Sequence, residues 1–262
     1  MKLIFTGTGS FTGYWIVKEL LSKGFEVIPL FEESLIKTTG IRKIRILDLS
    51  KLTKCYFKIN YGSKKFFDFL SSLDKIDIFS HHFFYTKDYK SSGYDILESL
   101  NISVGNVDLL FKKLKKLGCK FFVLTGSSFE SREGKGDKEL KPFSPYGLSK
   151  SLSSDIFKYY CSLYGIKFCK FVISNPFGPY EEYKFTSYLA DKWLNNETAI
   201  IKTPDYVRDN IPVDLLAKSY SYFLKKIKNK NFYKLNPSGY VETNLDFVKR
   251  MRKEFKKRLN LK

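Results

Sequence analysis

Apolar residues follow two different periods along the first two thirds of the chain. Short apolar runs predict strands, whereas apolar residues spaced three and four apart predict helices. The runs predict strands at Lys2–Thr6, Phe25–Leu30, Ile44–Leu47, Ile76–Ser80, Lys120–Thr125 and Lys167–Ile173. The helical spacing predicts helices at Gly13–Lys23, Phe66–Leu73, Tyr94–Leu117 and Pro145–Tyr164. Strands that interleave with helices predict an α/β fold of the Rossmann type, a doubly wound parallel sheet.

The alternation weakens after Asn175. The pattern there predicts helices at Thr186–Leu194, Val213–Lys226 and Leu245–Leu259, with a short strand at Ala199–Ile201. We therefore expect residues 1–174 to form a dinucleotide-binding domain. Residues 175–262 should form a small C-terminal substrate lobe, partly interleaved with the main sheet. The last predicted helix carries its apolar residues on one side, which is typical of an amphipathic helix docked on a protein.

Charge and cysteine content narrow the function classes. The 262 residues carry a formal net charge of +19, but the lysines are spread along the whole chain. This distribution predicts a solvated surface that attracts an anionic ligand, and no nucleic-acid partner. No apolar stretch reaches the ~18 residues of a membrane span, so no membrane partner is expected. The four cysteines form no CxxC pair and there are only two histidines. We expect no metal site, reduced thiols and a cytoplasmic location.

A glycine-rich turn follows the first predicted strand and opens a helix. Glycines at this place let the backbone turn tightly and approach a pyrophosphate, which lies at the positive helix N-terminus. We expect a dinucleotide to contact Gly7, Gly9, Ser10, Phe11, Thr12 and Gly13.

The residues expected at the adenosine end of the dinucleotide do not decide between NAD and NADP as the cofactor. Glu32 follows the second strand, where a carboxylate holding the ribose favours NAD. Lys37, Arg42 and Lys43 alternatively pair with a 2′-phosphate. Asp48, with Leu49 beside it, comes directly after the expected third strand and is the candidate partner of the adenine amino group.

Tyr146 and Lys150 form a YxxxK pair at the start of a predicted helix. Ser144 and Pro145 precede the tyrosine as an N-cap and a first-turn proline, so residues four apart lie on one helical face. An ammonium near a phenol lowers the pKa of the phenol, which suits a general acid or base acting on a sugar hydroxyl. Ser127 ends the strand before this helix and offers a hydroxyl to the same substrate oxygen.

Taken together, these motifs resemble the extended short-chain dehydrogenase/reductase family, in its NAD-dependent epimerase/dehydratase branch of nucleotide-sugar enzymes. Thr6–Gly13 resembles the TGxxGFxG turn of that family. Asp77–Phe84 resembles its D-x-x-x-H-x-A-A segment, with His81 at the histidine. Asn175–Pro179 and Arg208–Asp214 resemble its N-x-x-G-P and R-D-x-I-H-V-x-D segments.

The resemblance implies a catalytic role for three residues. Tyr146 would exchange a proton with the sugar oxygen. Lys150 would tune the tyrosine and hold the nicotinamide ribose, and Ser127 would orient the reacting group. The resemblance implies a nucleotide-linked sugar as the substrate. It is also compatible with a homodimer.

The resemblance also implies binding roles. His81, Pro176 and Phe177 would border the cofactor, with the last two flanking the nicotinamide. Asn175 would touch the substrate, and Arg208 would neutralise its diphosphate through charge-assisted hydrogen bonds.

Departures from the family pattern narrow the reaction. Dehydratases of this branch carry an Asp-Glu pair after the catalytic hydroxyl, whereas Ser128 and Phe129 stand here. Simple redox at one sugar carbon is left, as in a 4-epimerase or 4-ketoreductase. Phe83 and Phe84 replace a small alanine pair and narrow the cofactor cleft. The alternative function is therefore a non-catalytic dinucleotide-binding regulator or scaffold.

Overall fold

The computed structural model describes residues 1–133, 144–228 and 233–259. Its main body is a parallel sheet in the order β2-β1-β3-β4-β5-β8. These strands are β1 (Lys2–Phe5), β2 (Glu26–Pro29), β3 (Ile78–His81), β4 (Phe121–Ser127), β5 (Lys167–Ile173) and β8 (Lys234–Leu235). A smaller mixed sheet contains β6 (Asn175–Phe177), β7 (Val207–Pro212) and β9 (Tyr240–Thr243). The α/β class predicted from the sequence is confirmed.

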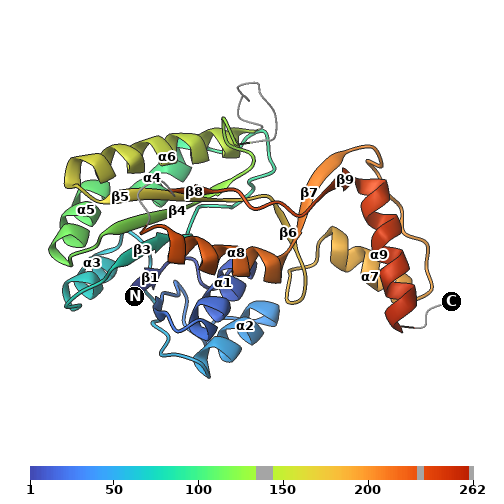
Figure 1. Ribbon diagram of the computed structural model, residues 1–262, viewed down its shortest axis with the longest axis horizontal. Helices are drawn as coiled ribbons and strands as arrows, with labels where there is room; N and C mark the ends of the chain where they lie inside the picture. Colours follow the sequence, from blue (N-terminus) through green and yellow to red (C-terminus); the bar gives the residue numbers. More distant parts are fainter. Residues whose placement is uncertain (134–143, 229–232, 260–262) are drawn as a thin grey trace.

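Helices cover both faces of the main sheet (Figure 1). One face is covered by α1 (Phe11–Ser22), α2 (Gly40–Ser50) and α8 (Val213–Lys226). The other is covered by α3 (Lys64–Ser71), α4 (Ile96–Val104), α5 (Val107–Lys116) and α6 (Pro145–Tyr164). Successive side chains of a strand point to opposite faces. Leu3 and Phe5 of β1 therefore enter one core, and Ile4 enters the other.

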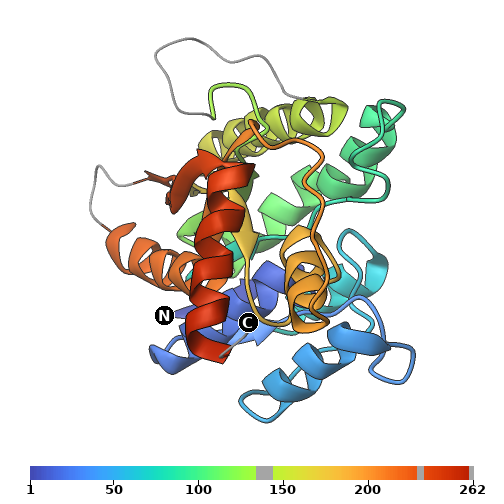
Figure 2. The same ribbon diagram turned by 90° about the vertical axis from the view of Figure 1, so that its right-hand side faces the viewer.

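The small sheet and two helices form a lobe beside the main body (Figures 1 and 2). Helices α7 (Phe185–Leu194) and α9 (Asn244–Leu259) pack together around Leu189, Trp193 and Phe247. The predicted strand at Ala199–Ile201 is wrong, because these residues lie in a loop between α7 and β7. The apolar pattern missed β6, β7 and β9, which are short and rich in polar residues.

The predicted third strand, Ile44–Leu47, is also wrong: this segment lies in α2. Its buried residues are Arg45, Ile46 and Leu49, which are spaced as on one helical face and not alternately as on a strand. Beside the outer edge of β2 there is instead an isolated parallel bridge between Leu30 and Tyr56, with the Tyr56 N–H donating to the Pro29 carbonyl oxygen at 3.2 Å.

The long helix expected over Tyr94–Leu117 is divided into α4 and α5. Asn106 has a left-handed φ of 59°, which ends α4 and starts α5 in a new direction. A Cβ on Gly105 would lie 2.3 Å from the carbonyl oxygen of Asn101, so the break needs glycine there. Over the part of the chain that is described, no helix has the length and apolar character needed to cross a membrane.

Helix α2 connects the glycine-rich turn to the lobe through Arg45. This guanidinium is 1% exposed. It donates to the carbonyl oxygens of Gly9 at 2.9 Å and Tyr180 at 2.8 Å, and it pairs with Glu182. Because a buried charge is stable only when it is paired, Arg45 fixes the turn and the loop after β6 relative to each other.

We expect Arg45→Met to lower the free energy of unfolding by roughly 3 kcal/mol, because it leaves two carbonyl oxygens without their charged donor. Urea denaturation measures this loss. Lys43→Met, at an exposed position of the same helix, should stay within about 0.5 kcal/mol of the wild type. Equal stability of the two variants would contradict the role of Arg45.

Candidate functional site

The carboxyl ends of β1, β3, β4 and β5 lie at one edge of the sheet, because the four strands are parallel. Ligands of open α/β sheets bind at this edge. The turn after β1, the segment after β3 and the end of β4 carry residues that the sequence singles out. Helix α6 starts at the same edge, with Ser144 as N-cap accepting from the Gly147 N–H at 3.2 Å and Pro145 in its first turn.

The turn after β1 is held by close backbone packing. Gly7 has φ +69°, and a Cβ on it would lie 2.9 Å from the Phe83 nitrogen. A Cβ on Gly13 would lie 2.4 Å from the Gly7 carbonyl oxygen. Ser10, which replaces the family's middle glycine, is the N-cap of α1 and accepts from the Gly13 N–H at 3.0 Å. The start of α1, with Phe11 and Thr12 in its first turn, therefore faces the edge as an anion site.

A cavity of about 10 Å³, the size of one water molecule, lies at the adenosine end of this edge. It is lined by Thr6, Gly7, Leu30, Glu32, Ile59, Tyr61, Phe66 and Phe83. The Tyr61 hydroxyl is buried with no hydrogen-bond partner. Burial raises the pKa of Glu32, which the charge of Arg42 partly offsets. The structure thus brings Glu32 and Gly7 to the same small cavity, together with the rings of Tyr61 and Phe83, whose centroids are 5.6 Å apart.

Arg42 lies over the glycine-rich turn. Its Nε would be 2.9 Å from a Cβ on Gly9, and this nitrogen is buried without a partner. An unpaired guanidinium nitrogen beside a helix N-terminus is suited to a phosphate. With the unpaired Tyr61 hydroxyl, this nitrogen suits the polar groups of a dinucleotide, whereas the cavity at this edge, about 10 Å³, has room for about one water molecule.

Asp48 and Leu49 lie elsewhere, because their segment is helical. The Asp48 carboxylate accepts from Lys18 at 2.7 Å and from the Tyr14 hydroxyl at 2.6 Å, on the outer side of α1. Leu49 is fully buried in the core between α1 and α2. The premise that Asp48 follows a strand is therefore wrong, and the structure does not bring either residue to the small cavity.

Tyr146 lies in a cage of aromatic rings. Its ring centroid is 5.7 Å from that of Phe84, 5.4 Å from Tyr89 and 5.9 Å from Tyr94. Burial raises the pKa of Tyr146, and the Glu130 carboxylate raises it further. The lowered phenol pKa that the YxxxK pair predicts is therefore not found, and the phenol is protonated at neutral pH.

The contacts of Lys150 explain why the pKa of Tyr146 is not lowered. Its Nζ donates to the Thr125 carbonyl oxygen at 2.6 Å and lies 4.3 Å from the centre of the Phe84 ring. Phe84 therefore contacts both members of the YxxxK pair, and the ammonium is engaged with Thr125. Burial lowers the pKa of Lys150 to about 8. The sequence singles out Phe84 as a bulky ring in the expected cofactor cleft, but it does not indicate that this ring contacts both Tyr146 and Lys150.

Ser127 ends β4 beside a buried ion cluster that sequence reasoning missed. The Ser127 Oγ accepts from the Phe129 N–H at 3.2 Å, and its own N–H donates to Glu130 at 2.7 Å. Glu130 pairs with Lys170 of β5 at 2.5 Å. Lys170 also pairs with Glu133, which pairs with Lys234. These partners are distant in sequence, so only the strand pairing reveals them.

The two histidines after β3 have different surroundings. His81 is buried among core rings, with Nε2 3.1 Å from the Ser103 carbonyl oxygen. His82 reaches the edge and hydrogen-bonds Thr12 and Thr125, both at 2.9 Å. Burial lowers the pKa of each to about 3, so both are neutral. Within the described ranges, no cluster of histidine, cysteine and carboxylate side chains is placed to hold a metal ion.

The residues predicted in the lobe lie along β6 and β7. The Asn175 side chain donates to Asn210 of β7 at 2.5 Å. Pro176 is half-buried, while the Phe177 ring packs on Phe247 in the lobe core, 5.2 Å between centroids. Arg208 is exposed, with its guanidinium 5.2 Å from the centre of the Tyr206 ring. Arg208 is thus open to a ligand, whereas Phe177 points into the lobe.

Comparison with known proteins gives a consistent picture. A model of the NAD dependent epimerase/dehydratase family matches residues 3–235. The CDP-abequose synthase of Salmonella muenchen is 25% identical over 238 residues, covering 88% of this chain and 73% of that protein. A putative UDP-glucose 4-epimerase of Methanocaldococcus jannaschii is 36% identical over 92 residues, which span 31% of this chain and 30% of that protein.

Solved structures share the fold at low identity. A UDP-glucose 4-epimerase of Thermotoga maritima has a TM-score of 0.74 at 20% identity, covering 98% of this chain and 82% of that one. A UDP-glucuronic acid 4-epimerase of Bacillus cereus has a TM-score of 0.76 at 16% identity, covering 97% and 83%. The second structure holds UDP-glucuronic acid and NAD.

The lowered pKa of Lys150, about 8, predicts a pH-dependent contribution to stability. An unfolded lysine titrates near 10.4, so between about pH 8 and about pH 10.4 the unfolded chain binds the extra proton. The free energy of unfolding should therefore rise with pH in that window for the wild type relative to Lys150→Met. Urea denaturation at both ends of the window measures this difference, with Lys158→Met, exposed on the same helix, as control. A difference that stays constant with pH would contradict the burial of a titrating ammonium.

Proposed function

Because the chain belongs to the NAD dependent epimerase/dehydratase family, we propose that it catalyses NAD(P)-dependent redox at one carbon of a nucleotide-linked sugar. Reduction of a 4-keto group is the direction we favour over 4-epimerisation. The observation that carries this proposal is the position of Tyr146, which lies among the rings of Phe84, Tyr89 and Tyr94 at the start of α6, at the sheet edge where Ser127 ends β4.

Tyr146 acts as the general acid in this proposal. NAD(P), when bound, supplies the hydride that reduces the keto carbon. As charge develops on the carbonyl oxygen, the Tyr146 hydroxyl donates its proton there. Burial raises the pKa of the phenol, so at neutral pH the hydroxyl carries the proton that a reduction consumes.

Ser127 and Lys150 support this step. The Ser127 hydroxyl can donate to the same carbonyl oxygen while its Oγ accepts from the Phe129 N–H. The charge of the Lys150 ammonium, which donates to the Thr125 carbonyl oxygen, stabilises the phenolate left after proton transfer. Arg208, exposed on β7, pairs with the diphosphate of the substrate.

The carboxylates around the site argue against elimination of water. Ser128 and Phe129 stand where dehydratases of this family carry their acid pair. Glu130 is 2% exposed, and its two oxygens are engaged by the Ser127 N–H and by Lys170. The similarity to the CDP-abequose synthase, which extends over 88% of this chain, supports a nucleotide-linked sugar as the reactant or product.

The choice between NAD and NADP depends on two side chains. Glu32 lines the adenosine cavity, and a carboxylate there suits the free ribose hydroxyls of NAD. Arg42 offers an unpaired nitrogen at Gly9, which suits a phosphate. Since the family is NAD-dependent, we propose NAD as the cofactor, with Glu32 on the ribose and Arg42 on the diphosphate.

The competing function is a non-catalytic dinucleotide-binding scaffold. The observation that favours it is the small size of the cavity lined by Tyr61 and Phe83, about 10 Å³, together with the contact of the Phe84 ring with Lys150. An assay of hydride transfer distinguishes the two functions, because a non-catalytic scaffold transfers no hydride.

We also propose that the chain forms a homodimer through α6. Leu152, Tyr159 and Leu163 are exposed on this helix by 39%, 64% and 58%. Leu97 on the adjacent α4 is 78% exposed. Apolar side chains gathered on neighbouring helices are typical of a surface that another copy covers.

Tyr146→Phe should slow hydride transfer about 10²–10⁴-fold, because it removes only the proton-donating hydroxyl. Binding of the dinucleotide should survive. The measurement is single-turnover oxidation of reduced nicotinamide with a panel of 4-keto nucleotide sugars. Tyr89→Phe, which removes a hydroxyl from the same aromatic cage, is the matched control and should keep its rate. Equal rates for wild type and Tyr146→Phe would refute the assignment, and no transfer by the wild type on any substrate would favour the scaffold.

The homodimer is tested by Leu152→Glu. Light scattering of the wild type should give twice the 30.6 kDa chain mass, and the variant should shift towards the single-chain mass because burying its carboxylate is costly. Leu52→Glu, at a 52% exposed leucine outside α6, should remain dimeric. A wild type that stays monomeric at all concentrations would exclude the dimer.

A further inference from the structure

The lobe contains a second concave site that the proposed reaction does not use. It is a cavity of about 450 Å³ between the end of α7, the loop that follows it and one side of α9. Its size falls within the range of small-molecule pockets. No residue of the glycine-rich turn and none of Ser127, Tyr146 or Lys150 lines it. Both α7 and α9 lie at the end of the molecule away from the main sheet (Figures 1 and 2).

One wall and the floor of this cavity are apolar and aromatic. Trp193 of α7, only 9% exposed, packs edge-on against Phe255 of α9, with 5.4 Å between the ring centroids. Ala199 and Ile201 of the loop line the facing wall, and Val248 lies between the helices. A flat apolar ligand group can pack against such a surface, and an aromatic base stacks well on an indole.

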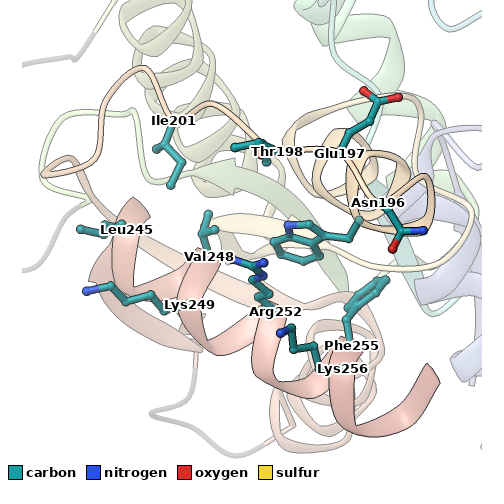
Figure 3. Close-up of a pocket in the computed structure, with 12 residues that line it drawn as sticks. Asn196, Glu197, Thr198, Ile201, Leu245, Val248, Lys249, Arg252, Phe255 and Lys256 are labelled. Atoms are coloured by element: carbon teal, nitrogen blue, oxygen red, sulfur yellow. The ribbon is translucent and has the colours of Figure 1, made fainter. Parts of the chain in front are cut away.

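The opposite rim is cationic. Lys249, Arg252 and Lys256 follow one another at spacings of three and four residues, which places them on one side of α9. Figure 3 shows Arg252 pointing from α9 into the centre of the cavity, with Val248 and Phe255 on either side of it and Ile201 and Thr198 on the facing wall.

These cations are poorly neutralised by the protein. Among the described residues, no carboxylate lies within 4.0 Å of Arg252 or Lys256, and Lys249 has only Asp246, at 4.0 Å. Glu197 also lines the cavity, but its carboxylate is paired with Lys192. Like charges three and four residues apart repel each other on a helix. An anion in the cavity would remove that repulsion.

We propose that this cavity binds a phosphorylated nucleoside independently of the Tyr146 site. The base packs against Trp193 and the apolar wall, and the phosphates are held by Arg252 and Lys256 with Lys249 at the rim. Thr198 and Asn196, which also line the cavity, offer a hydroxyl and an amide to the edge of the base. The bound group is either a free nucleotide or the nucleotide part of a larger molecule, because both present the same base and phosphates to the cavity.

Trp193 makes the site directly observable. The chain has two tryptophans, Trp15 and Trp193, so in a Trp15→Phe background fluorescence reports on this cavity alone. UDP and ADP should quench the Trp193 fluorescence saturably. Uridine, which lacks the phosphates, and inorganic pyrophosphate, which lacks the nucleoside, should quench it only weakly. Combining Arg252→Gln with Lys256→Gln should weaken UDP binding by about a hundredfold, or about tenfold for each cation removed.

Two controls make the result specific. Lys253→Gln removes the same charge from the same helix, but Lys253 does not line the cavity, so it should leave binding unchanged. Arg208→Gln, aimed at the proposed substrate diphosphate, should also leave it unchanged. A UDP-sugar that quenches as UDP does would identify nucleotide sugars as a source, and quenching by free UDP alone would identify free nucleotides. The proposal is overturned if the wild type shows no saturable quenching up to millimolar UDP, or if either control weakens binding as much as the double variant.

Discussion

A lysine buried inside a parallel sheet is the constraint on which the site depends. Lys170 of β5 is 8% exposed, and a charge in such surroundings needs partners within hydrogen-bonding distance. Its partners, Glu130 and Glu133, follow β4 directly, so the chain has to turn back as soon as the strand ends. A Cβ on Gly126 would lie 2.7 Å from Lys170, which is why this position is glycine. The same cluster holds the Ser127 N–H and, through Lys234, the last strand of the sheet.

Aromatic rings set the second constraint, because they occupy space that a cofactor also needs. Phe84 contacts both Tyr146 and Lys150, and burial raises the pKa of the phenol and lowers that of the lysine. Tyr61 and Phe83 line the small cavity at Gly7. The Tyr61 hydroxyl and the Arg42 Nε are buried without a hydrogen-bond partner. A ligand bound at this edge would therefore gain hydrogen bonds to these two polar atoms, and it has to fit beside the rings.

The sequence predicted the features that are local and missed those that depend on distant contacts. Strands β1 to β5 and most helices that cover them follow from periodicity, whereas β8, a strand of two residues, does not. The turn at Gly7–Gly13 follows from its glycines. The helix at Gly40–Ser50 was mistaken for a strand because four consecutive residues, Ile44–Leu47, fit both patterns. The pairing of Lys170 with Glu130 spans 40 residues, and the position of the Phe84 ring depends on how α6 packs. Neither leaves a signal in one sequence.

The course of the chain between the main body and the lobe has a consequence for how such a molecule can evolve. The backbone leaves the main sheet after β5, returns to it with α8 and β8, and enters the lobe again with β9 and α9. Helix α8 supplies Leu216, Tyr220 and Phe223 to the core on one face of the main sheet. No single cut can therefore separate the two parts, because truncation after β5 would uncover that core. Recombination therefore cannot exchange the lobe as one continuous segment. A change of ligand has to arise from point substitutions within the lobe.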